Sequence, residues 1–114
     1  GTEIAAVFSN NETLTTNIVQ LGNEIQDYMW LLPLHQNYQS MLESKIADMV
    51  NSAKLGYAGA ITAALFLQRF VDKNIDWLHF DLMAWNVTSQ PGRPEGGEAM
   101  ALRGLYSYLQ QNNE

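Results

Sequence analysis

The chain has 114 residues, of which 46% are apolar and only 16% are charged, so it suits one folded domain and excludes disorder driven by charge. Six basic residues against twelve acidic ones give a net charge of −6, which disfavours nucleic acid and anionic membranes as partners. The chain contains no cysteine, which excludes disulfides, thiolate metal sites and a cysteine nucleophile. Because no apolar run is long enough to span a bilayer and Gly1-Thr2-Glu3 does not resemble a signal peptide, we expect a cytoplasmic protein in which residues 1–114 form one domain.

The first third of the chain predicts a strand, a helix and a connector. Residues 2–8 form a short apolar run that is typical of a buried strand. Ser9 and Glu12 have the spacing of a capping box and precede a helix. The apolar residues of this helix recur at steps of three and four, at Leu14, Ile18, Leu21, Ile25 and Tyr28. Residues 27–34 are also apolar, but Pro33 is incompatible with a central strand, so we expect a buried connector there.

The remaining segments continue the alternation of strands and helices. They are a short helix at Tyr38, Met41 and Leu42, a strand over 46–50, a loop over 51–59, a helix over 60–71, a turn over 72–76, a strand over 77–82, a loop over 83–97 and an amphipathic helix over 98–110 with Leu102, Leu105 and Leu109 on one side. This rhythm predicts a layered α/β fold with a small, mostly parallel sheet. The helix over 60–71 is apolar on nearly every side, so it must be buried against other elements on more than one side. We therefore expect the three strands to be part of a larger sheet.

The candidate acid–base and ligand residues are few. His35 and His79 lie in different predicted elements, without the spacing of a metal site. His79 and Asp81 share one face of a strand, where Asp81 could orient His79 as a base, but a structural polar contact is the favoured alternative. Asp48, inside a predicted strand, is either a ligand or, as we favour, a hydrogen-bond anchor for a loop.

The glycine-rich segment and the strand ends offer the other candidate sites. Residues 92–97 precede the last helix and could cradle an anion at its N-terminus, although a tight turn is the simpler interpretation. Met83 and Trp85 lie where a strand ends, and ligands of α/β sheets gather beyond such ends. The residues alone assemble no complete active site, so the best candidate is the crevice beyond Val50 and Leu82.

Four segments carry a resemblance to a known family. They are WLLPLHQNYQSMLESKIADMVN at 30–51, AGAITAALFLQRFV at 58–71, WLHFDLMAWN at 77–86 and GRPEGGEAMALRGLYSYL at 92–109. Together they resemble the C-terminal part of the leucyl (cytosol) aminopeptidases, the M17 metallopeptidases, over residues 4–109. The resemblance implies a partial α/β/α catalytic domain with a mixed central sheet.

The resemblance also implies an activity. Members of the family use two divalent metal ions, zinc or manganese, to remove N-terminal residues from peptides, and are typically hexamers. Their metal ligands lie upstream of the region matched here, so we expect this segment to hold no metal, to have no catalytic residue of its own and to be inactive alone. A partial sheet also leads us to expect self-association, most simply as a dimer.

The resemblance assigns a substrate-binding role to three residues. Ser52, Met83 and Asn86 match positions in the wall of the substrate pocket, where Met83 would narrow the pocket relative to alanine. The matches at Asp48, His79, Asp81 and the turn at 92–94 imply structural roles. The alternative to an aminopeptidase segment is a freestanding, non-catalytic binding or assembly domain that has kept the fold.

Overall fold

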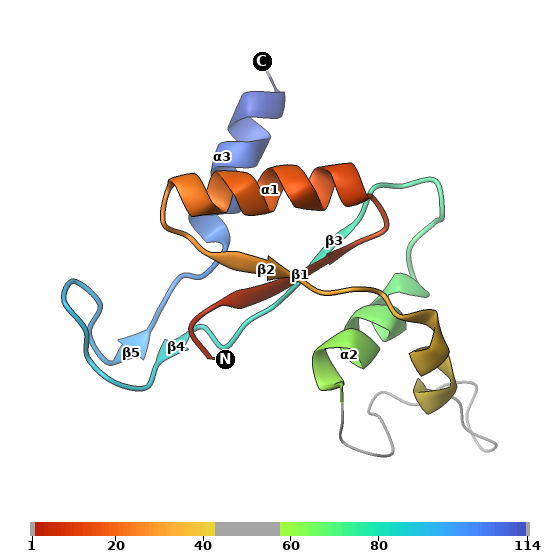
Figure 1. Cartoon of the computed structure of the whole chain (residues 1–114), viewed down its shortest axis with the longest axis horizontal. Helices are drawn as coiled ribbons and strands as arrows, with labels where there is room; N and C mark the ends of the chain where they lie inside the picture. Colours follow the sequence, from red (N-terminus) through yellow and green to blue (C-terminus); the bar gives the residue numbers. More distant parts are fainter. Residues whose placement is uncertain (1, 43–57, 114) are drawn as a thin grey trace.

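The computed structural model describes residues 2–42 and 58–113 (Figure 1). Its elements, in chain order, are β1 (Ala5–Ser9), α1 (Glu12–Glu24), β2 (Met29–Leu31), the 3₁₀ helix η1 (Gln36–Leu42), α2 (Gly59–Gln68), β3 (Leu78–Asp81), β4 (Trp85–Asn86), β5 (Gly96–Gly97) and α3 (Leu102–Asn112). The molecule is a flat slab of 49 × 38 × 17 Å, and helices lie on both sides of its main sheet. This confirms the layered α/β class that the sequence predicts.

The main sheet has the strand order β2-β1-β3 and is mixed. β1 pairs with β2 in parallel, with Ala6 opposite Trp30. It pairs with β3 in the antiparallel sense, with Phe8 opposite His79. The prediction of a mostly parallel sheet from the element rhythm is therefore wrong for β3, and the mixed sheet implied by the family resemblance is what the structure contains. The strand predicted over 46–50 lies outside the described residues.

The segment predicted as a buried connector contains a strand instead. Met29–Leu31 forms β2 at one edge of the described sheet, and the backbone N–H of Leu32 continues the ladder by donating to the Val7 carbonyl at 3.1 Å. Pro33 follows directly, so its missing N–H falls just past the paired residues. Because an edge strand is covered less than a central one, Trp30 and Leu31 are about half exposed.

The helix ends differ from the predicted ones. Asn11, not Ser9, caps α1, since its Oδ1 accepts a hydrogen bond from the Leu14 N–H at 3.1 Å. Ser9 instead donates through its hydroxyl to the Trp77 carbonyl at 2.6 Å, which joins the end of β1 to the start of β3. α2 ends three residues before the predicted residue 71, and α3 begins at Leu102 rather than at residue 98.

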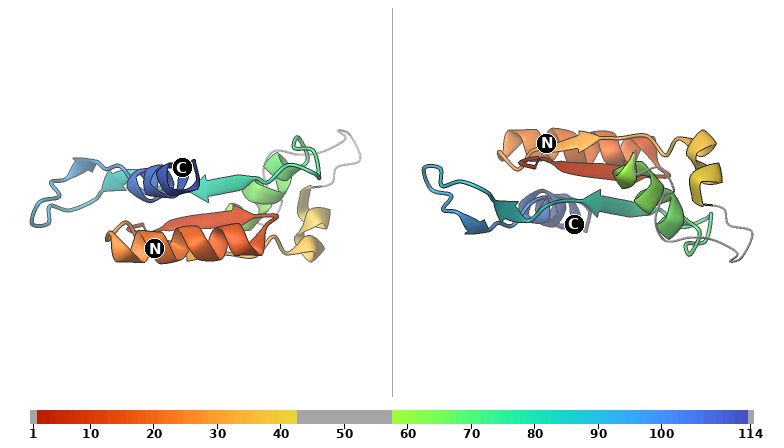
Figure 2. Two further views of the ribbon diagram at one scale, coloured as in Figure 1. Left: turned by 90° about the horizontal axis from the view of Figure 1, so that it is seen from above. Right: turned by 90° about the horizontal axis from the view of Figure 1, so that it is seen from below.

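β1 is buried on both faces and holds the two halves of the core together. Ala5 and Val7 point to the side where α1 and α3 lie, and pack with Ile18 and Met29. Ala6 and Phe8 point to the other side and pack with Ala64 of α2 and its neighbours. Figure 1 shows α1 and α3 above the strands and α2 below them, and Figure 2 shows that α1 and α3 lie side by side whereas α2 lies near one end of the opposite face.

The predicted loop over 83–97 contains a second small sheet. β4 and β5 pair in the antiparallel sense, with Trp85 opposite Gly97 and Asn86 opposite Gly96. This ribbon extends from the end of the molecule opposite α2 (Figure 1). Within residues 2–42 and 58–113, no helix is long and apolar enough to cross a membrane.

Candidate functional site

His79 lies on β3, is partly buried and packs against two aromatic rings. Its ring stacks on that of Trp77, with centroids 6.1 Å apart and an interplanar angle of 7°, and it also contacts the Phe8 ring at 5.8 Å. Burial lowers the pKa of His79 below its ordinary value of 6.5, and the negative charge of Asp81 opposes that shift in part. The Nε2 atom is buried and has no hydrogen-bond partner among the described residues. The geometry therefore favours the structural interpretation of His79 over a catalytic base.

The described part of the chain does not fit a metal ion. Across residues 2–42 and 58–113, no three His, Cys, Asp or Glu side chains gather closely enough to hold one. His35 contacts Tyr38 edge-on at 4.8 Å, in a different part of the fold from His79.

The candidate substrate wall begins where β3 ends. Met83 follows β3 and is 47% exposed, and Ala84 next to it adopts a left-handed backbone conformation with φ of 56°. β4 begins directly after this turn and contains Asn86, three residues beyond Met83. Ser52 lies outside the described residues, as do Asp48 and Val50, so the structure presents only the side of the predicted crevice next to Leu82.

Asn86 is held by hydrogen bonds within the ribbon. Its Nδ2 donates to the Glu98 carboxylate at 2.6 Å and to the Pro94 carbonyl at 3.2 Å. Both amide hydrogens are therefore engaged, and the Oδ1 atom is the part of the side chain left to accept a further hydrogen bond. Asn86, but not Met83, lines a hollow of about 350 Å³ together with Gln90 and Arg93.

A carboxylate of the chain itself occupies the N-terminus of α3. Asp27 is 5% exposed, and its two oxygens accept hydrogen bonds from the backbone N–H groups of Ala101 at 3.0 Å and Gly104 at 2.8 Å. The proposed anion cradle at this helix end is thus already filled, and Gly96 and Gly97 pair in β5 instead of facing a ligand. Sequence reasoning missed Asp27, and the only signal was an acidic residue at the start of an apolar run.

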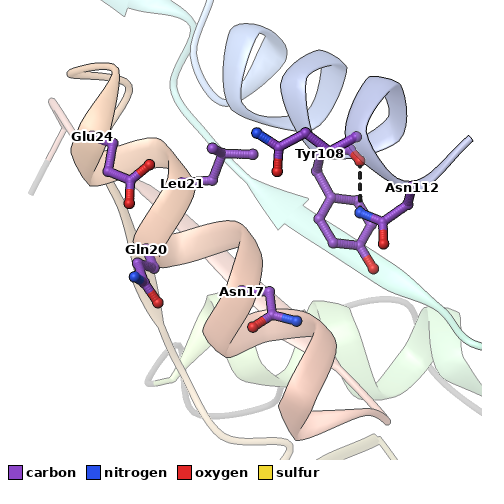
Figure 3. Close-up of a pocket in the computed structure, with 7 residues that line it drawn as sticks. Asn17, Gln20, Leu21, Glu24, Tyr108 and Asn112 are labelled. Atoms are coloured by element: carbon purple, nitrogen blue, oxygen red, sulfur yellow. Dashed lines mark hydrogen bonds between the residues drawn. The ribbon is translucent and has the colours of Figure 1, made fainter. Parts of the chain in front are cut away.

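Two further hollows are lined largely by polar side chains. The first, of about 340 Å³, lies between α1 and α3 and is lined mainly by amide side chains, with Glu24 as its one acidic residue and Tyr108 at its edge (Figure 3). Asn112 there donates to the Tyr108 carbonyl at 2.8 Å. The second, of about 770 Å³, lies beyond Ser9 and Leu31 and has Glu12 as its one acidic residue. The hydroxyls of Ser9, Thr15 and Thr16 also line the second hollow, but within the described residues none of them donates a hydrogen bond to the Glu12 carboxylate.

Comparison with known proteins places the chain in a family. The catalytic domain of the cytosol aminopeptidase family matches residues 1–106. A probable cytosol aminopeptidase of Rickettsia bellii is 34% identical over 117 residues, which cover 100% of this chain and 23% of that protein. A probable cytosol aminopeptidase of Ehrlichia ruminantium is 36% identical, with 98% of this chain and 23% of that protein covered.

Solved structures give the same result. The cytosol aminopeptidase from Coxiella burnetii superposes with a TM-score of 0.95 and 47% identity, over 100% of this chain and 25% of that one. The bottromycin maturation enzyme BotP, in complex with Mn, superposes with a TM-score of 0.91 and is 31% identical, over 100% of this chain and 26% of that one. The chain therefore spans about a quarter of the length of these relatives. It belongs to the cytosol aminopeptidase family, as part of the catalytic domain.

Proposed function

We propose that the chain is the C-terminal segment of a longer aminopeptidase, which removes N-terminal residues from peptides, and that it supplies part of the substrate-pocket wall. The observation that carries this proposal is the superposition of the whole chain on a quarter of the Coxiella burnetii enzyme with a TM-score of 0.95. The described sheet supports it, because β2 and β3 each have one side without a paired strand in that part of the chain. Such edges are where further strands of a larger domain would pair.

The metal ions would be held by other segments of that enzyme. BotP was solved in complex with Mn, which supports a divalent metal, zinc or manganese, in the longer protein. Such an ion, held by those other segments, would supply polarisation of the scissile carbonyl and activation of a water molecule. The residues of this chain would do something different: Ser52, Met83 and Asn86 would contact the N-terminal side chain of the peptide and select it by size and polarity.

The first test separates an aminopeptidase segment from a freestanding binding or assembly domain. We expect the full-length protein that carries this chain to hydrolyse leucine amide with Mn²⁺ or Zn²⁺, and the purified 114-residue chain to be inactive under the same conditions. An open reading frame that continues upstream into acidic and lysine metal ligands would support the same conclusion. Metal-dependent turnover by the verified, uncontaminated 114-residue chain would contradict it.

The second test concerns the wall. In the full-length enzyme, Met83→Ala should enlarge the pocket and shift kcat/KM toward larger apolar N-terminal residues, by about 1–3 kcal/mol between substrates that differ by a few methylenes. Val87→Ala is the matched control, because Val87 is an exposed apolar residue four positions further along the same segment. Unchanged kcat/KM ratios for Ala, Leu, Met and Phe substrates in Met83→Ala would remove Met83 from the wall.

The chain should also associate with copies of itself, as a dimer in isolation and as a hexamer in the full-length enzyme. The support for the dimer is the side of β2 that has no paired strand within the described residues, where Trp30 and Leu31 are half exposed. The hexamer rests on the family resemblance alone. Sedimentation equilibrium over a concentration series measures this directly. A folded chain that stays monomeric at high micromolar concentration would contradict the dimer and favour the freestanding domain.

A further inference from the structure

We propose that Glu98, which directly follows β5, is a positioning residue for the substrate-pocket wall, because it holds the segment from Met83 to Asn86 in place. This inference rests on the proposed function, which makes that segment part of the wall. It adds a residue that contacts no substrate and acts through Ala84 and Asn86.

Glu98 contacts the wall segment at two points. Its backbone N–H donates to the Ala84 carbonyl at 3.0 Å, and its Oε2 accepts from the Asn86 amide at 2.6 Å. The Glu98 side chain is only 18% exposed, and its other oxygen lies 3.9 Å from the Arg93 guanidinium. A short hydrogen bond to a carboxylate in partly dry surroundings is stronger than one between neutral groups. Glu98 is thus tied to both ends of the turn that follows Met83.

The turn needs this support because its backbone is strained. Ala84 has φ of 56°, a region that costs a residue with a side chain free energy relative to glycine. A strained conformation persists only when its surroundings impose it, and the contacts of Glu98 with Ala84 and Asn86 do so. If the turn relaxed, Met83 would change position, and the pocket would lose the shape that selects the substrate.

The same contacts define the role of Asn86. Both of its amide hydrogens are used, by Glu98 and by Pro94. Asn86 can therefore face a peptide only as an acceptor, through Oδ1. When Glu98 is removed, one amide hydrogen is released, and the side chain can rotate or present a donor to the substrate. The effect of Glu98 on specificity thus passes through a polar group as well as through Met83.

The first measurement reads the position of the wall without relying on activity. Hydrogen exchange of peptides spanning residues 83–98 is followed by mass spectrometry in the full-length protein and in three variants. Glu98→Ala should increase exchange in this segment, since local opening becomes easier. Glu98→Gln should restore most of the protection, because its amide oxygen can still accept from Asn86. Glu95→Ala, which removes an exposed glutamate from the same loop, should leave exchange unchanged.

The second measurement reads the consequence for substrates. Glu98→Ala should raise KM for leucine substrates by about tenfold with a smaller change in kcat, because a misplaced wall weakens ground-state and transition-state binding alike. The ratio of kcat/KM between leucine and phenylalanine substrates should also shift. Glu98→Gln should return both values toward the wild type, and Glu95→Ala should match the wild type.

The outcomes separate this inference from the proposed function. Faster exchange together with a shifted substrate ratio supports the role of Glu98. Unchanged exchange overturns it, and so does faster exchange with an unchanged KM and substrate ratio. A wild-type full-length protein without aminopeptidase activity overturns the proposed function, and with it the link from Glu98 to a substrate, whatever the exchange data show about the ribbon.

Discussion

The two faces of the main sheet differ in how completely this chain covers them. On the face toward α1 and α3, the core residues Val7, Ile18 and Met29 are almost fully buried. On the face toward α2, Phe8 is fully buried, but Trp30, which pairs with Ala6 and so shares this face, is 48% exposed. α1 and α3 cover the first face except at its β2 edge, where Leu31, opposite Val7, is 50% exposed, whereas α2 covers only one end of the second face. The difference indicates where the rest of a catalytic domain would pack.

The first face is closed by a close approach between two helices. A Cβ atom added to Gly22 of α1 would lie 2.5 Å from the Asp27 carbonyl oxygen, and one added to Gly104 of α3 would lie 3.7 Å from the Gly22 Cα. The Met29 methyl group sits against both glycines. The buried carboxylate of Asp27 then joins the start of α3 to the turn after α1. The second face shows no comparable junction among the described residues.

Removal of the Asp27 carboxylate should have the largest effect on the closed face. Asp27→Ala leaves the backbone N–H groups of Ala101 and Gly104 buried without partners, so we expect the free energy of unfolding to fall by about 2–5 kcal/mol. Urea denaturation measures the loss. Asp27→Asn should lose less, because its one oxygen still accepts. Asp76→Ala removes an exposed acidic residue and serves as the control, and an equal loss there would show that the cap contributes nothing special.

A methyl group between the helices should have the next largest effect. Gly22→Ala forces the added Cβ against the backbone of Asp27, so we expect a loss of about 2–3 kcal/mol in unfolding free energy. Gly104→Ala should lose less, because its Cβ meets chiefly the flexible end of Met29.

The matching rescue sharpens this difference between the two glycines. Met29→Val shortens the side chain and should recover part of the loss in Gly104→Ala, but little of the loss in Gly22→Ala, which meets backbone. Thermal unfolding of the single and double variants measures the coupling. An equal recovery in both would show that Met29 alone sets the spacing of the helices.

A change on the open face should have a small effect in the isolated chain. Trp30→Ser removes a half-exposed side chain, so we expect a loss of no more than about 1 kcal/mol in the 114-residue chain. In the full-length protein the same change should cost clearly more, because the remainder of the domain would bury Trp30. Similar losses in the two proteins would mean that nothing covers this face.

The smallest effect should be a pH dependence that comes from His79. Because its pKa is lower in the folded chain than the ordinary 6.5, the unfolded chain binds more protons as the pH falls through that range. The free energy of unfolding is therefore not reduced by His79 above pH 6.5. It decreases as the pH falls from there toward the lowered pKa of His79 in the folded chain. His79→Phe keeps an aromatic ring against Trp77 and should remove this part of the pH dependence. The free energy of unfolding, measured between pH 5 and pH 8, tests this prediction. If it depends on pH equally in the variant and the wild type, another group causes the dependence.

Local patterns in the sequence predicted the elements that depend on them. The spacing of Leu14, Ile18 and Leu21 indicates α1, and the apolar run at residues 2–8 indicates β1. β2 was missed because its three residues show no alternation of apolar and polar side chains and lie close before a proline. Only their pairing with β1 makes them a strand. The antiparallel direction of β3 depends on a long connection whose path no local pattern encodes.

The candidate site was less predictable for the same reason. Met83 was singled out by its place at a strand end and by a family resemblance, and Asn86 and Ser52 by the resemblance alone. The role of all three stays a prediction. The contacts of Asn86 with Glu98 depend on a ribbon of two-residue strands that no periodicity reveals. The family resemblance identified the segment, but the physical role of its polar residues required the tertiary structure.

The carboxylate of Asp27 also has a consequence for the order of folding. Its hydrogen-bond partners lie 74 and 77 positions further along the chain, so the start of α3 is set by a contact of very long range. Contacts of such separation form late, because a long loop must close before they can stabilise anything. We therefore expect α1, β1 and β2 to assemble first and α3 to dock last. During synthesis, Asp27 would stay hydrated until α3 has been made and docks against it.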